Sequence, residues 1–271
     1  MQLRTTLCAL SLGAGFCLPA YAAPCPAVTR VGISDQTDGQ YRRGVANLVI
    51  EELARRTGCR FAVSWFPVAR LHIQFSNRQL DMVMASLRTP GRDETGRYVP
   101  YAYTQFELLL KDSVTGRFRS LAEFVDGSTA RLNLPRGISY PDAVRAQLER
   151  LEAQGRLEYV KDYGVVFNKI KVGRAEGSLV PLVVQAQRLG PVGLANTMQG
   201  NPITEAPRRL LGAYLSRTTL PDSVYSSYAH TMADMVTDGT IQKIYATALG
   251  SEVAGRVFSS GTREILQTIE Y

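Results

Sequence analysis

The sequence has 271 residues, of which 45% are hydrophobic and 20% charged, and its formal net charge is +7. It contains no low-complexity tract or internal repeat, so a disordered or fibrous protein is excluded and one large or two modest globular cores are expected. The basic residues are scattered and do not alternate with aromatic residues. A solvated basic surface is therefore preferred to a nucleic-acid-binding surface.

The N-terminal segment has the pattern of a cleaved secretory signal. Arg4 precedes an apolar stretch over residues 7–18, and the small-residue pattern Ala20-Tyr21-Ala22 follows it. A membrane anchor is the alternative, but the stretch is shorter than the roughly 20 residues that a bilayer requires, and no later window is apolar for that long. We predict a signal over residues 1–22 and export to the periplasm.

Cleavage of this signal would leave two of the four cysteines, Cys25 and Cys59. An even pair in an exported chain is best interpreted as one disulfide, with two buried free thiols as the alternative. Both residues lie just before predicted strands that would start at the same edge of a parallel sheet, so their pairing is geometrically reasonable.

The first half of the mature chain alternates between strand-like and helix-like runs. Strands are predicted at residues 28–34, 59–66 and 80–87, and helices at 42–58, ending at Gly58, and at 68–79. This alternation is typical of an α/β fold with a mostly parallel sheet.

A second α/β unit follows a polar connector. Ser139 and Asp142 suggest a capping-box start for one of its helices. Strands near 106–112 and 208–217 would connect two lobes, and we expect lobe 1 over residues 23–112, an inserted lobe 2 over 113–213 and a return to lobe 1 over 214–271. The remaining expected elements are strands at 129–135, 156–163, 176–183 and 191–198, and helices at 139–155, 164–174 and 222–249.

Four stretches in this order resemble the family 3 periplasmic solute-binding proteins, the polar amino acid type that serves ABC importers. They are GVANLVIEELARRTGCRFAVSW, NRQLDMVMASLRTPGRDETGRYVPYA, LPRGISYPDAV with KIKVGRAEG, and MVTDGTIQKIYATALG. The resemblance covers nearly all the mature chain. It implies the type II two-lobe fold, a monomer without cofactor or metal, an anionic or zwitterionic small solute bound between the lobes, and a membrane permease as partner.

The resemblance also implies a carboxylate site. Arg92 matches the arginine that pairs with the ligand carboxylate, although its turn is one residue shorter than usual; a surface arginine is the alternative. A guanidinium suits this task because its planar fork meets both carboxylate oxygens. Ser86 matches a hydroxyl or backbone contact, and Ile138 and Ser139 match backbone amides at a helix start. Ser139 would alternatively serve as the helix cap.

Four further positions are candidates for contact with the ligand. Arg88 stands where a small hydroxyl residue is common, and it either points to solvent or supplies a second positive charge. Arg70, at a predicted helix start, recurs in relatives and is a candidate pocket residue. Trp65 would either line the pocket or belong to the core. Glu176, at the edge of the predicted cleft, is the last candidate for a ligand-binding residue.

The chain departs from the family pattern at the ammonium-binding aspartate, whose position falls at Pro181. An α-amino acid would then need another acid, with Asp35, Asp38 and Glu107 as candidates. This departure favours carboxylates or acidic amino acids over lysine or arginine as ligand.

Enzymatic function is the less favoured alternative. His72 and His230 are far apart and lack metal-ligand spacing, and no nucleophile elbow, phosphate loop or dinucleotide fingerprint is present. Glu176 is the one acid considered for general acid work, as in a diverged cyclohexadienyl dehydratase, although a glutamate at the edge of the cleft or on the surface is favoured. An orphan binder that reports to a sensor kinase is a further alternative.

Overall fold

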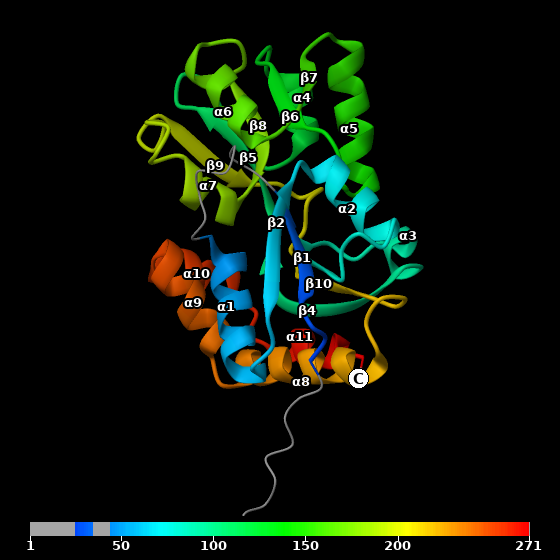
Figure 1. Ribbon diagram of the computed structural model, residues 1–271. Coiled ribbons are helices and arrows are strands. Elements are labelled where there is room, and N and C mark those ends of the chain that lie inside the picture. The colour runs from blue at the N-terminus through cyan, green and yellow to red at the C-terminus, as the bar shows by residue number, and fades with distance from the viewer. Residues whose placement is uncertain (1–24, 35–43, 271) are drawn as a thin grey trace, which may run out of the picture.

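The computed structural model describes residues 25–34 and 44–270. These residues form two five-stranded sheets flanked by helices, and Figure 1 displays them as two lobes, one above the other, with the first and last described residues at the lower lobe. The predicted two-lobe α/β class is confirmed. The predicted signal over residues 1–22 and the candidate acids Asp35 and Asp38 lie outside the described residues.

The first sheet has the strand order β2-β1-β3-β10-β4. β1, β2 and β3 are parallel, and β10 pairs antiparallel with both β3 and β4. The bounds are β1 Thr29–Ser34, β2 Phe61–Phe66, β3 Met82–Ser86, β4 Gly96–Thr104 and β10 Arg209–Ser216.

The second sheet repeats this arrangement with the order β7-β6-β8-β5-β9. β6, β7 and β8 are parallel, and β5 is antiparallel to both β8 and β9. The bounds are β5 Phe106–Lys111, β6 Leu132–Pro135, β7 Leu157–Val160, β8 Gly177–Pro181 and β9 Met198–Pro202.

Helices α4 to α7 belong to the second lobe, and the others surround the first sheet. α1 ends as predicted, because Gly58 adopts the left-handed conformation (φ 72°) in which its N–H caps the Ala54 carbonyl. The bounds are α1 Val45–Thr57, α2 Val68–Ser76, α3 Pro90–Asp93, α4 Leu121–Gly127, α5 Asp142–Ala153, α6 Tyr163–Lys171, α7 Leu182–Arg188, α8 Asp222–Thr237, α9 Thr240–Leu249, α10 Ser251–Val257 and α11 Arg263–Thr268.

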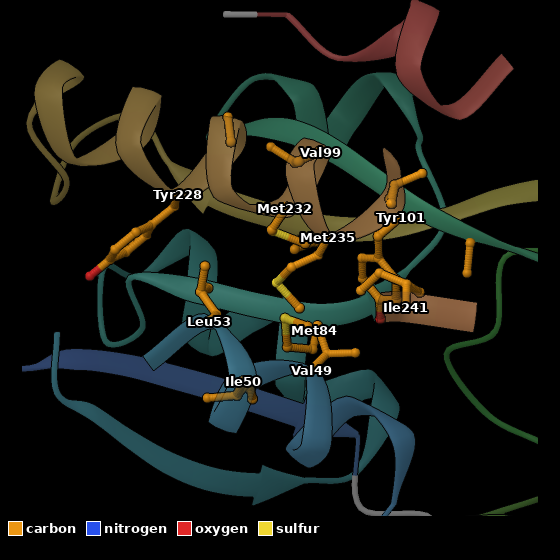
Figure 2. Packing of buried hydrophobic residues seen from close by; sticks show 14 of the residues in the cluster. Val49, Ile50, Leu53, Met84, Val99, Tyr101, Tyr228, Met232, Met235 and Ile241 are labelled. Carbon is orange, nitrogen blue, oxygen red and sulfur yellow. The ribbon is translucent and has the colours of Figure 1, made fainter. Parts of the chain in front are cut away.

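The core of the first lobe joins distant parts of the chain. Figure 2 shows Val49 and Leu53 of α1 near Met232 and Met235 of α8, with Met84 of β3 in the same cluster. All five side chains are fully buried. Burial of such a side chain contributes about 1.5 to 3 kcal/mol, so the C-terminal helices hold the N-terminal strands in place.

β5 is buried on both faces of the second sheet, where it lies between β8 and β9. Leu108 packs into one hydrophobic cluster and its neighbour Leu109 into another, on the opposite face. A continuous apolar run is what such a strand requires.

The predicted disulfide between Cys25 and Cys59 is present, with a Cα–Cα distance of 5.3 Å. It joins the segments that precede β1 and β2, which pair in parallel from Thr29 opposite Phe61. The chain ahead of the first strand is thereby attached to the sheet edge.

The sheets divide the chain at different residues than expected. β5 belongs to the second sheet, so the outward crossing comes at Gln105 and not at 112/113, and β10 belongs to the first sheet, so the return comes over residues 203–208. The reason is that β5 and β10 are each the antiparallel member of a single sheet. Neither strand connects the two sheets.

Three local expectations were also wrong. Residues 191–197 form turns, and the strand is Met198–Pro202. The strand expected over residues 176–183 ends at Pro181, and α7 starts at the next residue. Pro181 itself has an extended conformation and is the cap of that helix. α5 begins at Asp142 with Pro141 as its cap and without a side-chain cap hydrogen bond, so Ser139 does not cap it.

Among the described residues, no helix is long and apolar enough to cross a membrane.

Candidate ligand-binding site between the lobes

Two adjoining cavities lie between the lobes, where the carboxyl ends of β1, β3 and β8 meet. Their volumes are about 140 Å³ and about 80 Å³, which is room for several waters or a small solute. We name them the larger and the smaller compartment. They adjoin each other, because they share the lining residues Ser34, Ala85, Thr104, Pro181 and Leu211.

The smaller compartment contains the predicted carboxylate-binding arginine. Arg92, in the short helix α3, lines it, and its Nη1 donates a hydrogen bond of 2.8 Å to the Leu87 carbonyl. It forms no ion pair within residues 25–34 and 44–270. Burial lowers the pKa of Arg92, but an arginine remains charged in proteins. The result is a partly desolvated cation with free hydrogen-bond donors.

Ser86, at the end of β3, lines the same compartment and is 3% exposed. Its hydroxyl has no hydrogen-bond partner among the described residues. A buried polar group without a partner costs about 1 to 3 kcal/mol, and such groups need an explanation.

The backbone at Ala85 is unusual. Ala85 has φ 52°, in the left-handed region that non-glycine residues rarely adopt, and its N–H donates to the Tyr101 hydroxyl at 3.1 Å. The pairing of β3 with β10 is irregular at this point. Ala85 lines both compartments, and backbone strain of this kind concentrates at functional sites.

His72 of α2 also lines the smaller compartment, although the sequence patterns assigned it no role. Burial and the positive charge of Arg92 lower its pKa to about 3. The imidazole is therefore neutral at neutral pH and offers one donor and one acceptor. The position of His72 in the first turns of a helix that starts beside the cleft is the sequence signal that could have identified it as a lining residue.

The second lobe contributes Gly137, Ile138 and Ser139 to the smaller compartment. Gly137 has φ +84°, and a Cβ built on it would lie 2.7 Å from the backbone nitrogen of Ala69 in α2. Only glycine allows so close an approach. The two lobes therefore contact each other along this side of the cleft.

The larger compartment is mostly apolar. Trp65, at the end of β2, lines it together with α1, α7 and α9, as expected for the wall of a small-molecule site. The other apolar residues that it does not share with the smaller compartment are Ile33, Val45, Ala46, Tyr101, Val183, Val184 and Tyr245, and its polar residues are Ser34, Asn47, Thr104, Gln187 and the buried Arg188.

Two predicted arginines lie outside the cleft. Arg88 is exposed and forms ion pairs with Asp93 at 2.9 Å and Glu270 at 3.2 Å. Arg70 is exposed on α2. Neither lines a compartment, so the solvent-facing alternative for Arg88 agrees with the structure.

The two predicted acids are also engaged elsewhere. Glu176 precedes β8 and accepts a hydrogen bond from the Arg131 backbone nitrogen at 2.7 Å. It lies at the amino end of this strand, roughly 16 Å of strand rise from Pro181, and it lines neither compartment. Glu107 is buried and bonded to Gln185 and Arg256.

By sequence, no protein family model matches the chain, and no curated protein matches it. Solved structures match it over most of their length. An ancestral arginine-binding protein bound to glutamine matches with a TM-score of 0.67 at 15% identity, over 83% of this chain and 99% of that protein. This protein has the two-lobe fold of the solute-binding proteins.

Other solute-binding proteins match similarly. EhuB in complex with hydroxyectoine has a TM-score of 0.67 and 19% identity, and the match covers 89% of this chain and 94% of EhuB. A putative L-cystine ABC transporter protein from Listeria monocytogenes has a TM-score of 0.61 and 16% identity, over 84% and 98% of the two chains. The resemblance drawn from the sequence is thus confirmed for the fold, while the roles of the cleft residues stay predictions.

Proposed function

We propose that this protein is an exported, monomeric solute-binding protein of the family 3 type. It captures a small carboxylate-bearing solute between its lobes and presents it to the permease of an ABC importer. The shared fold supports this assignment, because several proteins with this fold are named as arginine-binding or as parts of amino acid ABC transporters.

The observation that carries the proposal is that Arg92 and Ser86 line the same smaller compartment. One is a largely buried guanidinium bonded to a single carbonyl, and the other is a buried hydroxyl without a partner among the described residues. A carboxylate accepts hydrogen bonds from both groups and compensates the buried positive charge. A neutral solute would leave that charge uncompensated.

Binding would act on the arrangement of the lobes. Arg92 and Ser86 belong to the first lobe, whereas Ile138 and Ser139 belong to the second. A solute that contacts both sides has higher affinity for the closed state and shifts the population toward it. The permease would recognise this state, with Gln105 and residues 203–208 as the hinge.

The disulfide favours a location outside the cytoplasm. A Cys25–Cys59 bond persists in an oxidising compartment, and the expected signal over residues 1–22 would direct the chain there. In a Gram-negative cell this compartment is the periplasm, where a soluble carrier meets its permease.

Native mass spectrometry of protein purified gently from the periplasm tests the proposal first. We expect one small carboxylate to be released on denaturation. Protein that carries no solute, and that binds no carboxylate in a calorimetric screen, would contradict the proposed function.

A matched pair of arginine variants tests the site itself. Arg92→Ala should weaken binding of the released solute by at least about 100-fold, because about 3 kcal/mol of charge-assisted hydrogen bonding is lost. Arg88→Ala removes a cation from the same turn but outside the cleft, and it should leave the affinity within about twofold. Equal affinities of the two variants would exclude Arg92 as the carboxylate ligand.

A further inference from the structure

We infer that the Tyr214 hydroxyl is a positioning group for carboxylate binding, because it holds the turn that directs Arg92 into the cleft. The inference rests on the proposed function, since it explains how the carboxylate-binding guanidinium is kept in place. We call residues 88–93 the arginine turn. The evidence is the exposure of this turn, the hydrogen bonds that the hydroxyl makes with both of its ends, and the burial of the tyrosine ring.

The arginine turn has little structure of its own. It consists of Arg88 and Thr89 followed by the four-residue helix α3, and all six residues are partly or fully exposed. The amides of Arg92 and Asp93 both donate to one carbonyl, that of Thr89. A single helical turn is not stable by itself, because it fixes several backbone dihedrals for very few hydrogen bonds. Contacts with the sheet must therefore set the direction of Arg92.

The Tyr214 hydroxyl binds both ends of α3. It accepts a hydrogen bond from the Thr89 N–H at 3.1 Å and donates one to Asp93 Oδ1 at 2.7 Å. Thr89 is the residue before α3, and Asp93 is its last residue. Burial and the hydrogen bond to Asp93 raise the pKa of Tyr214, so the hydroxyl stays protonated at neutral pH and remains a donor. The two bonds bridge the segment that contains Arg92.

Tyr214 is itself rigidly held. It belongs to β10, which lies between β3 and β4 in the first sheet, and its side chain is fully buried. Its ring packs against the rings of Tyr98 and Phe75, with centroid distances of 5.1 Å and 6.3 Å. A functional group is positioned accurately when the residues that support it are locked by packing on a regular element. Tyr214 meets this requirement for the arginine turn.

The bridge separates the directions of two adjacent charged residues. Arg92 lines the smaller compartment, whereas Asp93 binds Tyr214 and, through its other oxygen, Arg88 Nε at 2.9 Å. The Arg88 side chain is 42% exposed, and an exposed ion pair contributes little to stability. The buried hydroxyl is therefore the main support of Asp93, in agreement with the small effect expected for Arg88→Ala.

Binding of acetate tests the inference, because this probe presents a carboxylate and little else. Its titration is followed by NMR at the Nε–Hε signal of Arg92. Tyr214→Phe keeps the ring and removes the hydroxyl, and we expect it to weaken acetate binding by at least about fivefold. Tyr228→Phe is the matched control. It removes a buried hydroxyl that is 2.7 Å from Thr29 Oγ1, at the amino end of β1 and away from the cleft, and should change the affinity by less than about twofold.

Hydrogen exchange reports on the turn directly. The Thr89 amide, which donates to the Tyr214 hydroxyl, should exchange about tenfold faster in Tyr214→Phe and at an unchanged rate in Tyr228→Phe.

A second pair of variants leaves Tyr214 intact. Asp93→Ala removes the acceptor of the hydroxyl and should weaken acetate binding as much as Tyr214→Phe does. Asp93→Asn retains an acceptor oxygen and should restore the affinity to within about twofold of the wild-type value. Because both changes break the same bond, the double variant Tyr214→Phe/Asp93→Ala should be no more than about twofold weaker than either single variant.

The outcomes separate this inference from the proposed function. Acetate that leaves the Arg92 signal of the wild-type protein unmoved would contradict the proposed function, and the inference would fall with it. Binding that is as strong in Tyr214→Phe and Asp93→Ala as in the wild-type protein would overturn the inference alone. Equal losses in Tyr214→Phe and Tyr228→Phe would also overturn it, because the effect would then come from general stability.

Discussion

Glu107 of β5 and Arg256 of α10 form an ion pair that joins the second sheet to the helices of the first lobe. Glu107 is 2% exposed and also accepts a hydrogen bond from Gln185, whereas the Arg256 side chain is 44% exposed. The contact connects the two lobes on the α7 side, while Gly137 and Ala69 approach each other near α2. The lobes are therefore held together at both sides of the cleft.

Arg256→Ala should lower the free energy of unfolding by about 1 to 3 kcal/mol, because it leaves the Glu107 carboxylate buried with only an amide partner. The double variant with Glu107→Gln should cost less than the sum of the single changes. Urea unfolding of all four proteins measures this coupling. Additive effects would mean that the ion pair contributes nothing.

Gly137→Ala should weaken solute binding at least tenfold, because the added Cβ collides with the Ala69 backbone and opposes closure. Gly173→Ala is the control, since Gly173 also has a positive φ (+74°) but has open space around its Cβ position. Both variants should lose about 1 to 2 kcal/mol of stability through backbone strain. Calorimetry and urea unfolding separate the two effects, and equal loss of affinity in both variants would contradict a steric role in closure.

His72 should make the fold less stable as the pH falls. Its folded-state pKa of about 3 lies below the ordinary value of 6.5, so between these values the unfolded chain binds a proton that the folded chain does not. This contribution is complete above pH 6.5 and is lost as the pH falls toward 3, by at most about 1.4 kcal/mol per pH unit. Urea unfolding at pH 7.5, 5.5 and 4.5 should show a smaller loss for His72→Gln, and the same loss in both proteins would refute this.

Replacement of Cys25 and Cys59 together by serine should lower the free energy of unfolding by about 3 to 4 kcal/mol, the chain-entropy contribution of a loop of this length. Reductant should bring the wild-type protein to the same stability and leave the variant unchanged. A wild-type protein insensitive to reductant would show that the bond does not form.

The sequence by itself determined the elements whose signals are local. Apolar periodicity and the stop at Gly58 predicted α1, and apolar runs predicted β1 to β3. The disulfide was also predictable, because its two cysteines precede adjacent parallel strands. β4 was missed: it contains Pro100, which argues against a strand in general but is tolerated at the sheet edge that β4 occupies.

The tertiary structure alone decided which side chains face the cleft. Arg88 and Arg92 are four residues apart in one turn, yet Arg88 pairs with Glu270 from the far end of the chain and Arg92 turns into the cavity. Glu176 precedes β8 and Pro181 is its last residue, so the two lie at opposite ends of one strand and only Pro181 reaches the cleft. His72 acquires its low pKa from burial and from Arg92. Side-chain direction and electrostatic environment depend on partners distant in sequence, and local patterns do not encode them.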